Sequence, residues 1–513
     1  MSKISLIDIR KEFLNFFYSK GHDILPSSPL VPEDDDSLLF TNAGMVQFKN
    51  IFTGLENAPA KNKVTTAQKC VRAGGKHNDL ENVGLTKRHH TFFEMLGNFS
   101  FGDYFKDQAI ELAWNLITKN FAIPPEKLVI TIYHDDEEAY SIWKKVTSLH
   151  DSKIIRISTS DNFWEMGNSG PCGPCSEIFY DHGDKYLGGL PGSEDEGDRF
   201  VEIWNLVFMQ FNKFTDGQKE LLPRPSIDTG MGIERIAAIL QGKSDNYDID
   251  LFRYLIEVTK DTFKILENNK TAIPLRIISD HLRASCFLLS DGVIPSNEGR
   301  GYVLRRILRR AIRQIYTLNI KEPCFYKLVP ALVDQMGSHY TELYSYKDLI
   351  TQSIHNEEIK FLETLEKGLR ILEEENIASK ENRLFSGKVA FKLYDTYGFP
   401  IDLTEDVLKE NNKKVNFKEF EEAMLKQKTL SKKTWKGSFN NNNQDIWKKI
   451  ANDLPKTKFT GYEKLFSQET VKRIIFNGNT VLGKKIALDN GNIAILLGRS
   501  FFSILSIIYS FKI

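Results

Sequence analysis

Two strand-like segments joined by a loop stand out in the first quarter of the chain: Cys70-Val-Arg-Ala-Gly-Gly-Lys-His-Asn-Asp-Leu80 and Arg88-His-His-Thr-Phe-Phe-Glu-Met95. Alternate residues of a strand point to one face, so the second segment should present four functional groups together: Arg88, His90, Phe92 and Glu94. They suit a nucleotide, with a cation for phosphate, a ring for the base and a carboxylate for Mg²⁺ or an amine. Taken alone, the segment fits a buried aromatic strand beside a solvated basic loop equally well.

The first segment holds the candidate phosphate-binding groups. Arg72 stands just before Gly74-Gly75, where the backbone can approach a ligand closely because glycine has no side chain. Lys76 follows directly and is a further candidate for a phosphate.

A third segment, Asp228-Thr-Gly-Met-Gly-Ile-Glu-Arg-Ile-Ala-Ala-Ile-Leu240, ends a predicted strand with an acid, turns at glycines and enters an apolar helix. Arg235 lies in the first turns of that helix, where a positive side chain opposes the helix dipole. Its placement makes sense where an anion lies nearby. The alternative is an ordinary strand–turn–helix with a surface arginine, since a lone Gly-x-Gly is a weak signal.

A fourth pattern lies in Ile203-Trp204-Asn205-Leu-Val207, with Asn162-Phe-Trp164 before it. Asn205 and Val207 should share one face of a strand. An asparagine can orient an amino group, and a valine limits the room beside it. By itself, the pattern favours a core strand that carries one hydrogen-bonded asparagine.

Apolar spacing predicts the main elements of the first half. Residues 1–20 and 107–121 carry apolar side chains at helical spacing. Residues 129–133 and 200–211 are the clearest strands. Residues 167–199 are rich in Gly, Pro and Cys, which predicts a long loop with a functional role.

The pattern of apolar and charged residues changes near residue 250. The pattern is helical from 251 to about 428, an Asn-rich linker covers 438–444, and strand-like segments follow from 455. The 513 residues correspond to about three domains. We predict them at 1–250, 251–455 and 456–513.

Composition indicates a folded globular chain. Lys+Arg and Asp+Glu both number 68, so the net charge is zero, and 41% of residues are hydrophobic. A balanced total still allows local clusters that bind nucleic acid. We find no secretory signal and no apolar run of about 20 residues, so we expect a cytoplasmic protein with no membrane contact.

Five cysteines are too few, and odd in number, for a disulfide framework. Cys172-Gly-Pro-Cys175 and His182 have metal-like spacing, but they leave a zinc ligand set incomplete. We predict no metal there, with the thiols packed as small hydrophobic groups.

Together these segments resemble the catalytic core of the alanyl-tRNA synthetases, a family of class II aminoacyl-tRNA synthetases. The resemblance covers nearly all of residues 1–465. It implies an α+β fold: an antiparallel sheet flanked by helices, then an all-helical tRNA-recognition domain and the start of a β-barrel. Beyond the segments above, it rests on Gly21-His-Asp-Ile-Leu-Pro-Ser-Ser-Pro-Leu-Val-Pro32, Leu39-Phe-Thr-Asn-Ala-Gly-Met45, Leu96-Gly-Asn-Phe-Ser-Phe-Gly-Asp-Tyr-Phe105, Asp291-Gly-Val-Ile-Pro-Ser-Asn297 and Leu393-Tyr-Asp395-Thr-Tyr-Gly-Phe-Pro400.

The family's chemistry implies an ATP-dependent ligase that charges tRNA(Ala) with L-alanine through an alanyl adenylate, with ATP and Mg²⁺. Arg72 and Arg235 are the implied catalytic residues. The resemblance places ATP at Arg72, Lys76, His90, Phe92, Glu94, Trp164, Ile203, Trp204, Asn205, Gly232 and Arg235. It places alanine at Trp164, Asn205, Val207, Asp228 and Gly230. A carboxylate such as Asp228 facing an ammonium group also agrees with simple charge pairing.

The helical middle carries tRNA recognition in this family. Asn297 and Asp395 align with the residues that read the acceptor-stem G·U pair, whose exposed guanine amino group suits amide and carboxylate partners. Five arginines at helical spacing are expected to bind phosphates, with a solvated face as the alternative. They are Arg305, Arg306, Arg309, Arg310 and Arg313.

Two features depart from the family. The editing centre needs a His-x-x-x-His pair, which the ten histidines do not contain, so we expect no editing by this chain. The tail from Ala494 to Ile513 does not resemble the expected continuation, which suggests a frameshift or an early stop. Without the family's C-terminal oligomerising domain, we expect a monomer.

Overall fold

The computed structural model describes residues 4–32, 38–74, 77–167, 169–195, 197–378, 384–399, 401–409 and 413–426, and five short strands between 458 and 500. Contacts group the chain into two compact units. The first comprises residues 1–374 with 395–403, and the second comprises 375–394 with 404–513. The domain boundary predicted at residue 250 falls inside the first unit, and it stays a prediction.

The first unit is organised around a nine-stranded sheet in the order β1-β2-β5-β11-β10-β9-β6-β7, with β8 pairing β9. The central pairings are antiparallel, as expected, but β1–β2 and β6–β7 are parallel, so the sheet is mixed. The strands are β1 (Asp23–Ile24), β2 (Lys63–Val71), β5 (Phe92–Ser100), β6 (Leu128–Tyr133), β7 (Ile154–Ile157), β8 (Phe163–Glu165), β9 (Gly170–Asp181), β10 (Phe200–Lys213) and β11 (Lys219–Gly232).

The predicted motif strands are confirmed in part, because β5 begins at Phe92 and the predicted strand residues Arg88 and His90 precede it. β2 and β5 pair antiparallel from Lys63–Ser100 to Val71–Phe92, and a small hairpin of β3 (Ala73–Gly74) and β4 (His77–Asn78) lies in the loop between them. β11 ends at Gly232 and passes directly into helix α5 (Ile233–Leu240).

The predicted loop at 167–199 is wrong for its first part, because Gly170–Asp181 forms β9 between β10 and β6. Gly173 explains how a Gly-Pro-Cys segment fits there, since a Cβ at this position would overlap the carbonyl of Phe208 on β10. Glycine allows the two strands this close approach. The remainder, residues 182–199, connects β9 to β10.

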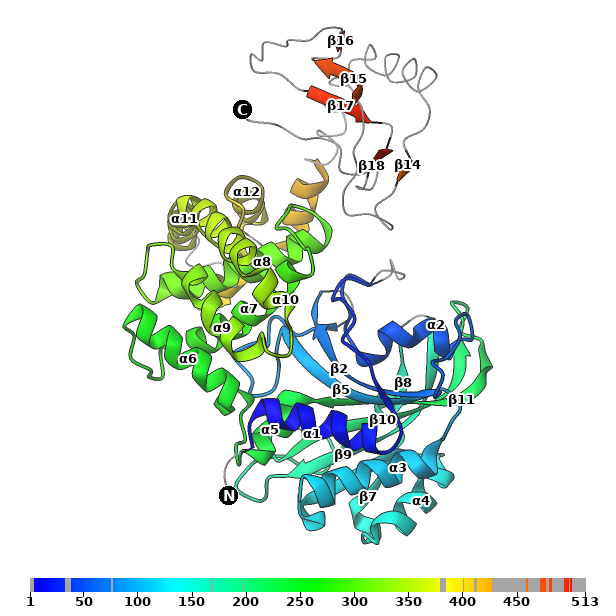
Figure 1. Ribbon diagram of the computed structural model, residues 1–513. Helices are drawn as coiled ribbons and strands as arrows, with labels where there is room; N and C mark the ends of the chain where they lie inside the picture. The colour runs from blue at the N-terminus through cyan, green and yellow to red at the C-terminus, as the bar shows by residue number, and fades with distance from the viewer. Residues whose placement is uncertain are drawn as a thin grey trace. The chain divides into compact units, whose positions relative to one another are not determined.

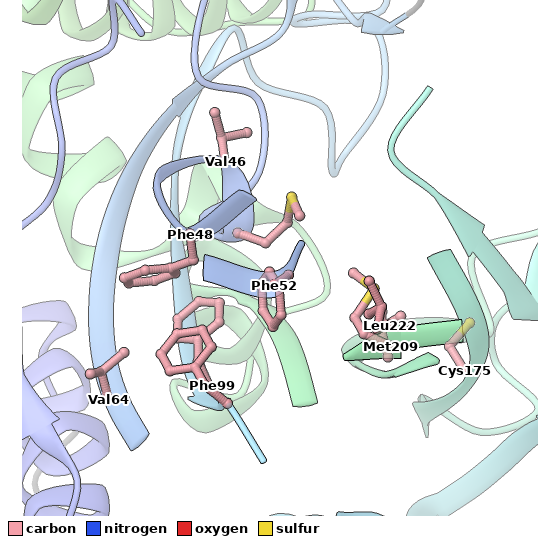
Figure 2. Packing of buried hydrophobic residues seen from close by; sticks show 11 residues of the cluster. Val46, Phe48, Phe52, Val64, Phe99, Cys175, Met209 and Leu222 are labelled. Carbon is pink, nitrogen blue, oxygen red and sulfur yellow. The ribbon is translucent and has the colours of Figure 1, made fainter. Parts of the chain in front are cut away.

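One face of the sheet carries a hydrophobic cluster (Figure 2). Phe48 lies 4.6 Å from Phe99, centroid to centroid, and 5.5 Å from Phe101. These residues come from η1 (Gly44–Phe48), β5 and the turn after it, and α2 (Lys49–Phe52) adds Phe52. Cys175, Val207, Met209 and Leu222 extend the cluster along β9, β10 and β11.

Helices cover the other face of the sheet. α1 (Leu6–Ser19), predicted from its apolar spacing, starts with a capping box between Ser5 and Asp8 and packs with α5 against β2 and β5 (Figure 1). α3 (Lys106–Asn115) follows, as predicted for 107–121, and α4 (Glu137–Thr147) packs against it.

Buried ion pairs join this face to the helices. Arg10 of α1 donates two hydrogen bonds of 2.7 Å to Glu94 of β5, which also accepts one from Tyr340. Arg283 of α7 (Ala272–Ser290) donates to Glu234 of α5 at 2.6 Å and to the carbonyl of Phe92 at 2.5 Å. Asp280, also on α7, accepts from the backbone of Thr91 at 3.0 Å.

The predicted helical pattern after residue 250 is confirmed through residue 378. Among the described helices, none combines the length and apolarity needed to cross a membrane. The helices in this stretch besides α7 are α6 (Asp250–Phe263), α8 (Gly299–Thr317), α9 (Val329–Met336), α10 (Glu342–Ser345) and α11 (Lys347–Ala378).

Short strands and helices make up the described part of the second unit. They are β12 (Leu384–Phe385), α12 (Gly387–Tyr397), α13 (Ile401–Lys409), β13 (Lys414–Val415), β14 (Lys458–Phe459), β15 (Val471–Phe476), β16 (Asn479–Val481), β17 (Ile493–Leu497) and β18 (Arg499–Ser500). Some of these elements continue into the first unit. β15 pairs with β16 and β17. The predicted barrel stays a prediction, and the linker at 438–444 lies outside the described residues.

Candidate active site

The register of β9, β10 and β11 brings the predicted pocket residues onto one face. Val207 pairs directly with Cys175 on one side and with Asp228 on the other. One step along, Asn205 pairs with Glu177 and with Gly230. Side chains of directly paired residues point to the same face, so Asn205, Val207 and Asp228 lie together beside the hydrophobic cluster.

Two adjoining cavities open on this face. The first has a volume of ≈ 150 Å³ and the second ≈ 350 Å³, and both are lined by Arg88, Glu202 and Arg235. The smaller cavity is also lined by Arg72, Asp79, His89, His90, Phe93, Met95, Gly230, Gly232, Glu234 and Asn246. The larger reaches Thr131, Asp161, Asn162, Glu177 and the Gly-rich segment 189–197.

Arg72 is half-buried and oriented by two contacts. Its Nε donates to the carbonyl of Asn42 at 3.2 Å, and its guanidinium lies 5.0 Å from the centroid of the Phe93 ring. Stacking and a backbone acceptor together restrict the rotamers of a long side chain. The guanidinium is therefore held at the wall of the smaller cavity before any ligand arrives.

Arg235 and Arg88 are held by carboxylates. Arg235 donates to the carbonyl and to the carboxylate of Glu202, at 3.0 and 2.9 Å. Arg88 pairs with Asp198 at 3.1 Å. Arg235 stands in the first turn of α5, as predicted, and the two cations together with Glu202 line both cavities.

Asp228 and Asn205 present unused acceptor atoms. Asp228 is buried, and among the described residues no hydrogen-bond partner contacts its carboxylate. Burial disfavours the charged form and raises the pKa of Asp228 to about 7. Asn205 donates through its amide nitrogen to Glu177 at 3.2 Å, whereas its oxygen is buried and accepts no hydrogen bond in the part of the chain that the structure describes. A bound cation would satisfy both groups.

Comparison with known proteins shows the family of the chain. The sequence profile of the family described as tRNA synthetases class II (A) matches residues 8–503. The chain belongs to this family.

Curated relatives of this class II synthetase are named alanine--tRNA ligase. The protein from Sinorhizobium medicae (strain WSM419) is 56% identical over 475 residues, which is 92% of this chain and 53% of that protein. The protein from Rhizobium meliloti (strain 1021) is 54% identical over 494 residues, 96% of this chain and 55% of that protein. The chain thus spans about half the length of the curated relatives it matches. Among solved structures, an apo histidyl-tRNA synthetase of S. aureus is similar with a TM-score of 0.29 and 11% identity over 52% of this chain and 79% of that one.

Two residues predicted to contact ATP lie on the opposite face of the synthetase sheet. Phe92 stacks on Phe287 of α7 at 4.3 Å, and Glu94 is fully buried in its bonds with Arg10 and Tyr340. Phe93 and Met95 line the cavity instead. Side chains alternate between the two faces along β5 as expected, but the residues on the cavity face are the odd-numbered ones, Phe93 and Met95.

His90 lines the smaller cavity but is buried. Its ring stacks on Phe252 at 4.8 Å, its Nε2 lies 3.1 Å from the Asn246 amide, and its Nδ1 lies 3.3 Å from Asp280. Both ring nitrogens thus face protein groups, and the ATP contact stays a prediction. Lys76 lies outside the described residues.

The predicted pocket walls divide between the two faces. Trp164, on β8, packs against the hydrophobic cluster that contains Val207. Ile203 is buried. Trp204 points to the helical side, where its ring lies 5.7 Å from Phe13 and 6.3 Å from Phe17. Trp204 therefore belongs to the core beneath the sheet and not to the pocket.

Three of the five arginines on α8 are buried, which corrects the predicted phosphate-binding face. Arg309 donates to Glu357 at 2.8 Å and to the carbonyl of Gly398, and Arg310 donates to the carbonyl of Leu80. Arg313 is 5% exposed. Protein acceptors from distant segments use the guanidiniums of Arg309 and Arg310. Arg305 and Arg306 are partly exposed and stay candidates for tRNA phosphates, and Arg305 also pairs with Glu357 at 3.2 Å.

The predicted base-reading residues are exposed. Asn297 precedes α8 and accepts a hydrogen bond from Arg305, and Asp395 lies on α12. Both are accessible to a large ligand, and their contact with tRNA stays a prediction.

All five cysteines are buried as free thiols. Cys175 belongs to the hydrophobic cluster, and the ring of His182 lies between Tyr180 and Tyr186. Within the described residues, no group of three or more His, Cys, Asp or Glu side chains is placed to hold a metal ion.

Several cavity residues escaped sequence reasoning, among them Phe93, Met95, Glu177 and Glu202. The alternation of side chains along β5 could have identified Phe93 and Met95. Because Phe92 and Phe93 are both aromatic, however, either set of alternate residues could be assigned to the site face. Glu177 and Glu202 carry no distinctive spacing, and only the pairing of β9 with β10 reveals them.

Proposed function

We propose that this chain activates L-alanine with ATP to form alanyl adenylate and transfers the alanyl group to the 3′ end of tRNA(Ala). The buried acceptor pair carries the proposal: the Asp228 carboxylate and the Asn205 amide oxygen share a face with Val207 beside a cavity lined by cations. This arrangement suits an ammonium group next to a small apolar side chain. The names of the relatives support the choice of alanine.

The activation step requires the alanine carboxylate to approach the α-phosphate of ATP, although both are negative. Arg72 lies at the cavity wall with its guanidinium already oriented, so it can neutralise both groups. Arg235, with its planar guanidinium, and Phe93 line the same cavity, and flat groups of this kind can bracket the adenine base. The chain's part is positioning and charge stabilisation, as in phosphoryl-group chemistry generally.

We propose Glu202 as the carboxylate that would hold Mg²⁺ together with ATP. The Glu202 carboxylate lines both cavities and has Arg235 as its ion-pair partner. Magnesium is usually held by one or two carboxylates together with substrate phosphates. Bound there with ATP, Mg²⁺ would help to neutralise the phosphate oxygens.

Val207 is proposed to limit the side chain of the substrate. It is 3% exposed and packed in the hydrophobic cluster, so it cannot move aside easily. Discrimination by one small group is worth only about 1–3 kcal/mol, so serine and glycine are the natural competitors. Because the 513 residues contain no His-x-x-x-His pair, we propose that this chain does not remove such errors itself.

For the transfer step we propose that Asn297 and Asp395 contact the acceptor stem, with Arg305 and Arg306 nearby for phosphates. Arg305 donates to the side chain of Asn297. This bond can orient the Asn297 amide for a base edge exposed in a shallow minor groove.

ATP–pyrophosphate exchange tests the proposed function. Exchange that depends on alanine, with serine and glycine much weaker, is the expected result, followed by charging of a tRNA(Ala) transcript. Folded protein that shows no exchange with any amino acid would refute the proposal.

The pH dependence of alanine binding follows from Asp228. Because its pKa is raised to about 7, the carboxylate is ionised above that value and binds an ammonium, whereas the protonated form does not. The KM for alanine should therefore be constant at high pH and rise below about pH 7, approaching tenfold per pH unit. Exchange kinetics between about pH 6 and 9, with the KM for ATP as reference, measure this.

Asp228→Asn is the matched control. It should fold with higher stability, because a buried charge is removed, but lose alanine-dependent exchange at every pH. A wild-type KM for alanine that does not change across the range contradicts the assignment.

A further inference from the structure

A row of directly paired polar residues crosses four strands at the floor of the site. Thr131 of β6 pairs with Glu177 of β9, Glu177 with Asn205 of β10, and Asn205 with Gly230 of β11. Their side chains therefore lie on one face, next to one another. Glu177 stands in the middle, between a hydroxyl and an amide.

The direction of the hydrogen bonds in this row is set from one end. The amide nitrogen of Asn162 donates to the carbonyl of Cys175 at 3.2 Å and to Thr131 Oγ1 at 3.0 Å. A backbone carbonyl can only accept, so the Asn162 nitrogen is fixed as the donor. Thr131 Oγ1 accepts this hydrogen bond and donates its own O–H to Glu177 Oε2 at 3.2 Å.

The other carboxylate oxygen of Glu177 acts on Asn205. Oε1 accepts from the Asn205 amide nitrogen at 3.2 Å. An amide is planar and has one donor end and one acceptor end. With its nitrogen directed to Glu177, the Asn205 oxygen is directed away, and this oxygen is the buried atom without a partner. It lies on the face that carries the unpartnered Asp228 carboxylate.

We propose that Glu177 is a positioning residue that fixes the orientation of the Asn205 amide, so that the oxygen and not the NH₂ group meets the ammonium of the amino-acid substrate. The inference rests on the proposed function and deepens it. If the amide turned over, an acceptor would be replaced by a donor beside a cation, and attraction would become repulsion. Recognition of the α-amino group thus depends on a residue that does not touch it.

Two stable adenylate analogues that differ only in the ammonium group test this. They are the 5′-O-sulfamoyladenosine conjugates of alanine and of propionate, and their dissociation constants are measured by calorimetry at about pH 8.5. Burial and the neighbouring Glu202 raise the pKa of Glu177 to about 8. Because the pH of the measurement lies above this value, the Glu177 carboxylate is mostly ionised. Wild type should bind the alanyl conjugate more tightly by about tenfold or more.

Glu177→Gln should lower this ratio severalfold, to the part that the Asp228 carboxylate maintains, while the propionyl conjugate binds as in wild type. A glutamine can turn its own NH₂ toward Asn205, and then the amide of Asn205 turns over. Glu126→Gln, at an exposed position, is the control for the same chemical change and should keep the wild-type ratio. A merely structural role would weaken both conjugates equally and would leave the ratio unchanged.

Exchanging the carboxylate at position 177 and the amide at position 205 should restore the preference for the alanyl conjugate. The double variant Glu177→Gln with Asn205→Asp keeps the total charge and places a carboxylate, which accepts at both oxygens, at position 205. It should recover most of the wild-type ratio.

The measurements distinguish failure of the proposed function from failure of the role inferred for Glu177. Wild type that binds neither conjugate refutes the proposed function, and the inference with it. Wild type that prefers the alanyl conjugate while Glu177→Gln keeps the same preference, or a double variant without recovery, overturns the role of Glu177 alone.

Discussion

Replacing Arg72 by alanine is expected to lower alanine-dependent ATP–pyrophosphate exchange by about 10²–10³-fold, mainly in kcat. The guanidinium is oriented by the Asn42 carbonyl and by the Phe93 ring before substrates bind. It therefore needs no reorganisation when charge develops between the carboxylate and the phosphate. Its removal leaves two anionic substrates facing each other without a cation at this wall.

Arg72→Lys is the informative control. Lysine keeps the charge but loses the planar fork and the stacking on Phe93, so exchange should stay well below wild type. Thermal unfolding checks that both variants are folded. Exchange in Arg72→Ala within about threefold of wild type, a difference below 1 kcal/mol, would show that the residue is not part of the reaction.

The largest effect on stability is expected from Glu94→Ala, at about 3–5 kcal/mol. Arg10 is 3% exposed, and two of its hydrogen bonds end on Glu94. Its charge would be left in the interior, and Tyr340 would lose its acceptor as well. Denaturant unfolding measures the loss, with Glu257→Ala as a control for an exposed ion pair, whose expected cost is below about 1 kcal/mol.

The stability contributed by the ionised Glu94 carboxylate depends on pH in a definite direction. Burial raises the pKa of Glu94, but the charge and hydrogen bonds of Arg10 and Tyr340 outweigh it and hold the pKa below its ordinary value. The contribution is therefore present above the ordinary value and is lost as the pH falls through the lowered one. Equal loss of stability in Glu94→Ala and Glu257→Ala would contradict the role of the buried pair.

Local patterns were sufficient to predict many elements. The apolar spacing of residues 1–20 predicted α1, and the alternation around Asn205 predicted a strand whose site face also carries Val207. Arg72 and Arg235 could be chosen because an unusual residue type stood at a strand end or helix start near glycines, whereas the strand predicted to end at Asp228 continues to Gly232.

Residues whose partners are distant in sequence could not be predicted. Glu94 has the charge expected of a ligand-binding residue, yet its partners come from positions 10 and 340, so it is part of the core. Arg309 and Arg310 have the spacing of a basic surface, but Glu357 and the carbonyls of Gly398 and Leu80 accept their hydrogen bonds. Such residues can be distinguished from ligand-binding ones only when the tertiary partner is known.

The bonds made by α7 limit how far this chain can be shortened without disturbing the candidate site. Asp280 and Arg283 bind the backbone of Thr91 and Phe92, immediately before the cavity residue Phe93. Cutting after residue 250, at the end of the predicted catalytic region, would remove the partners of a buried amide, a buried carbonyl and Glu234. Unpaired buried groups of this kind cost about 1–3 kcal/mol each. The shortest fragment that keeps the proposed activity should therefore extend past Ser290 and include α7.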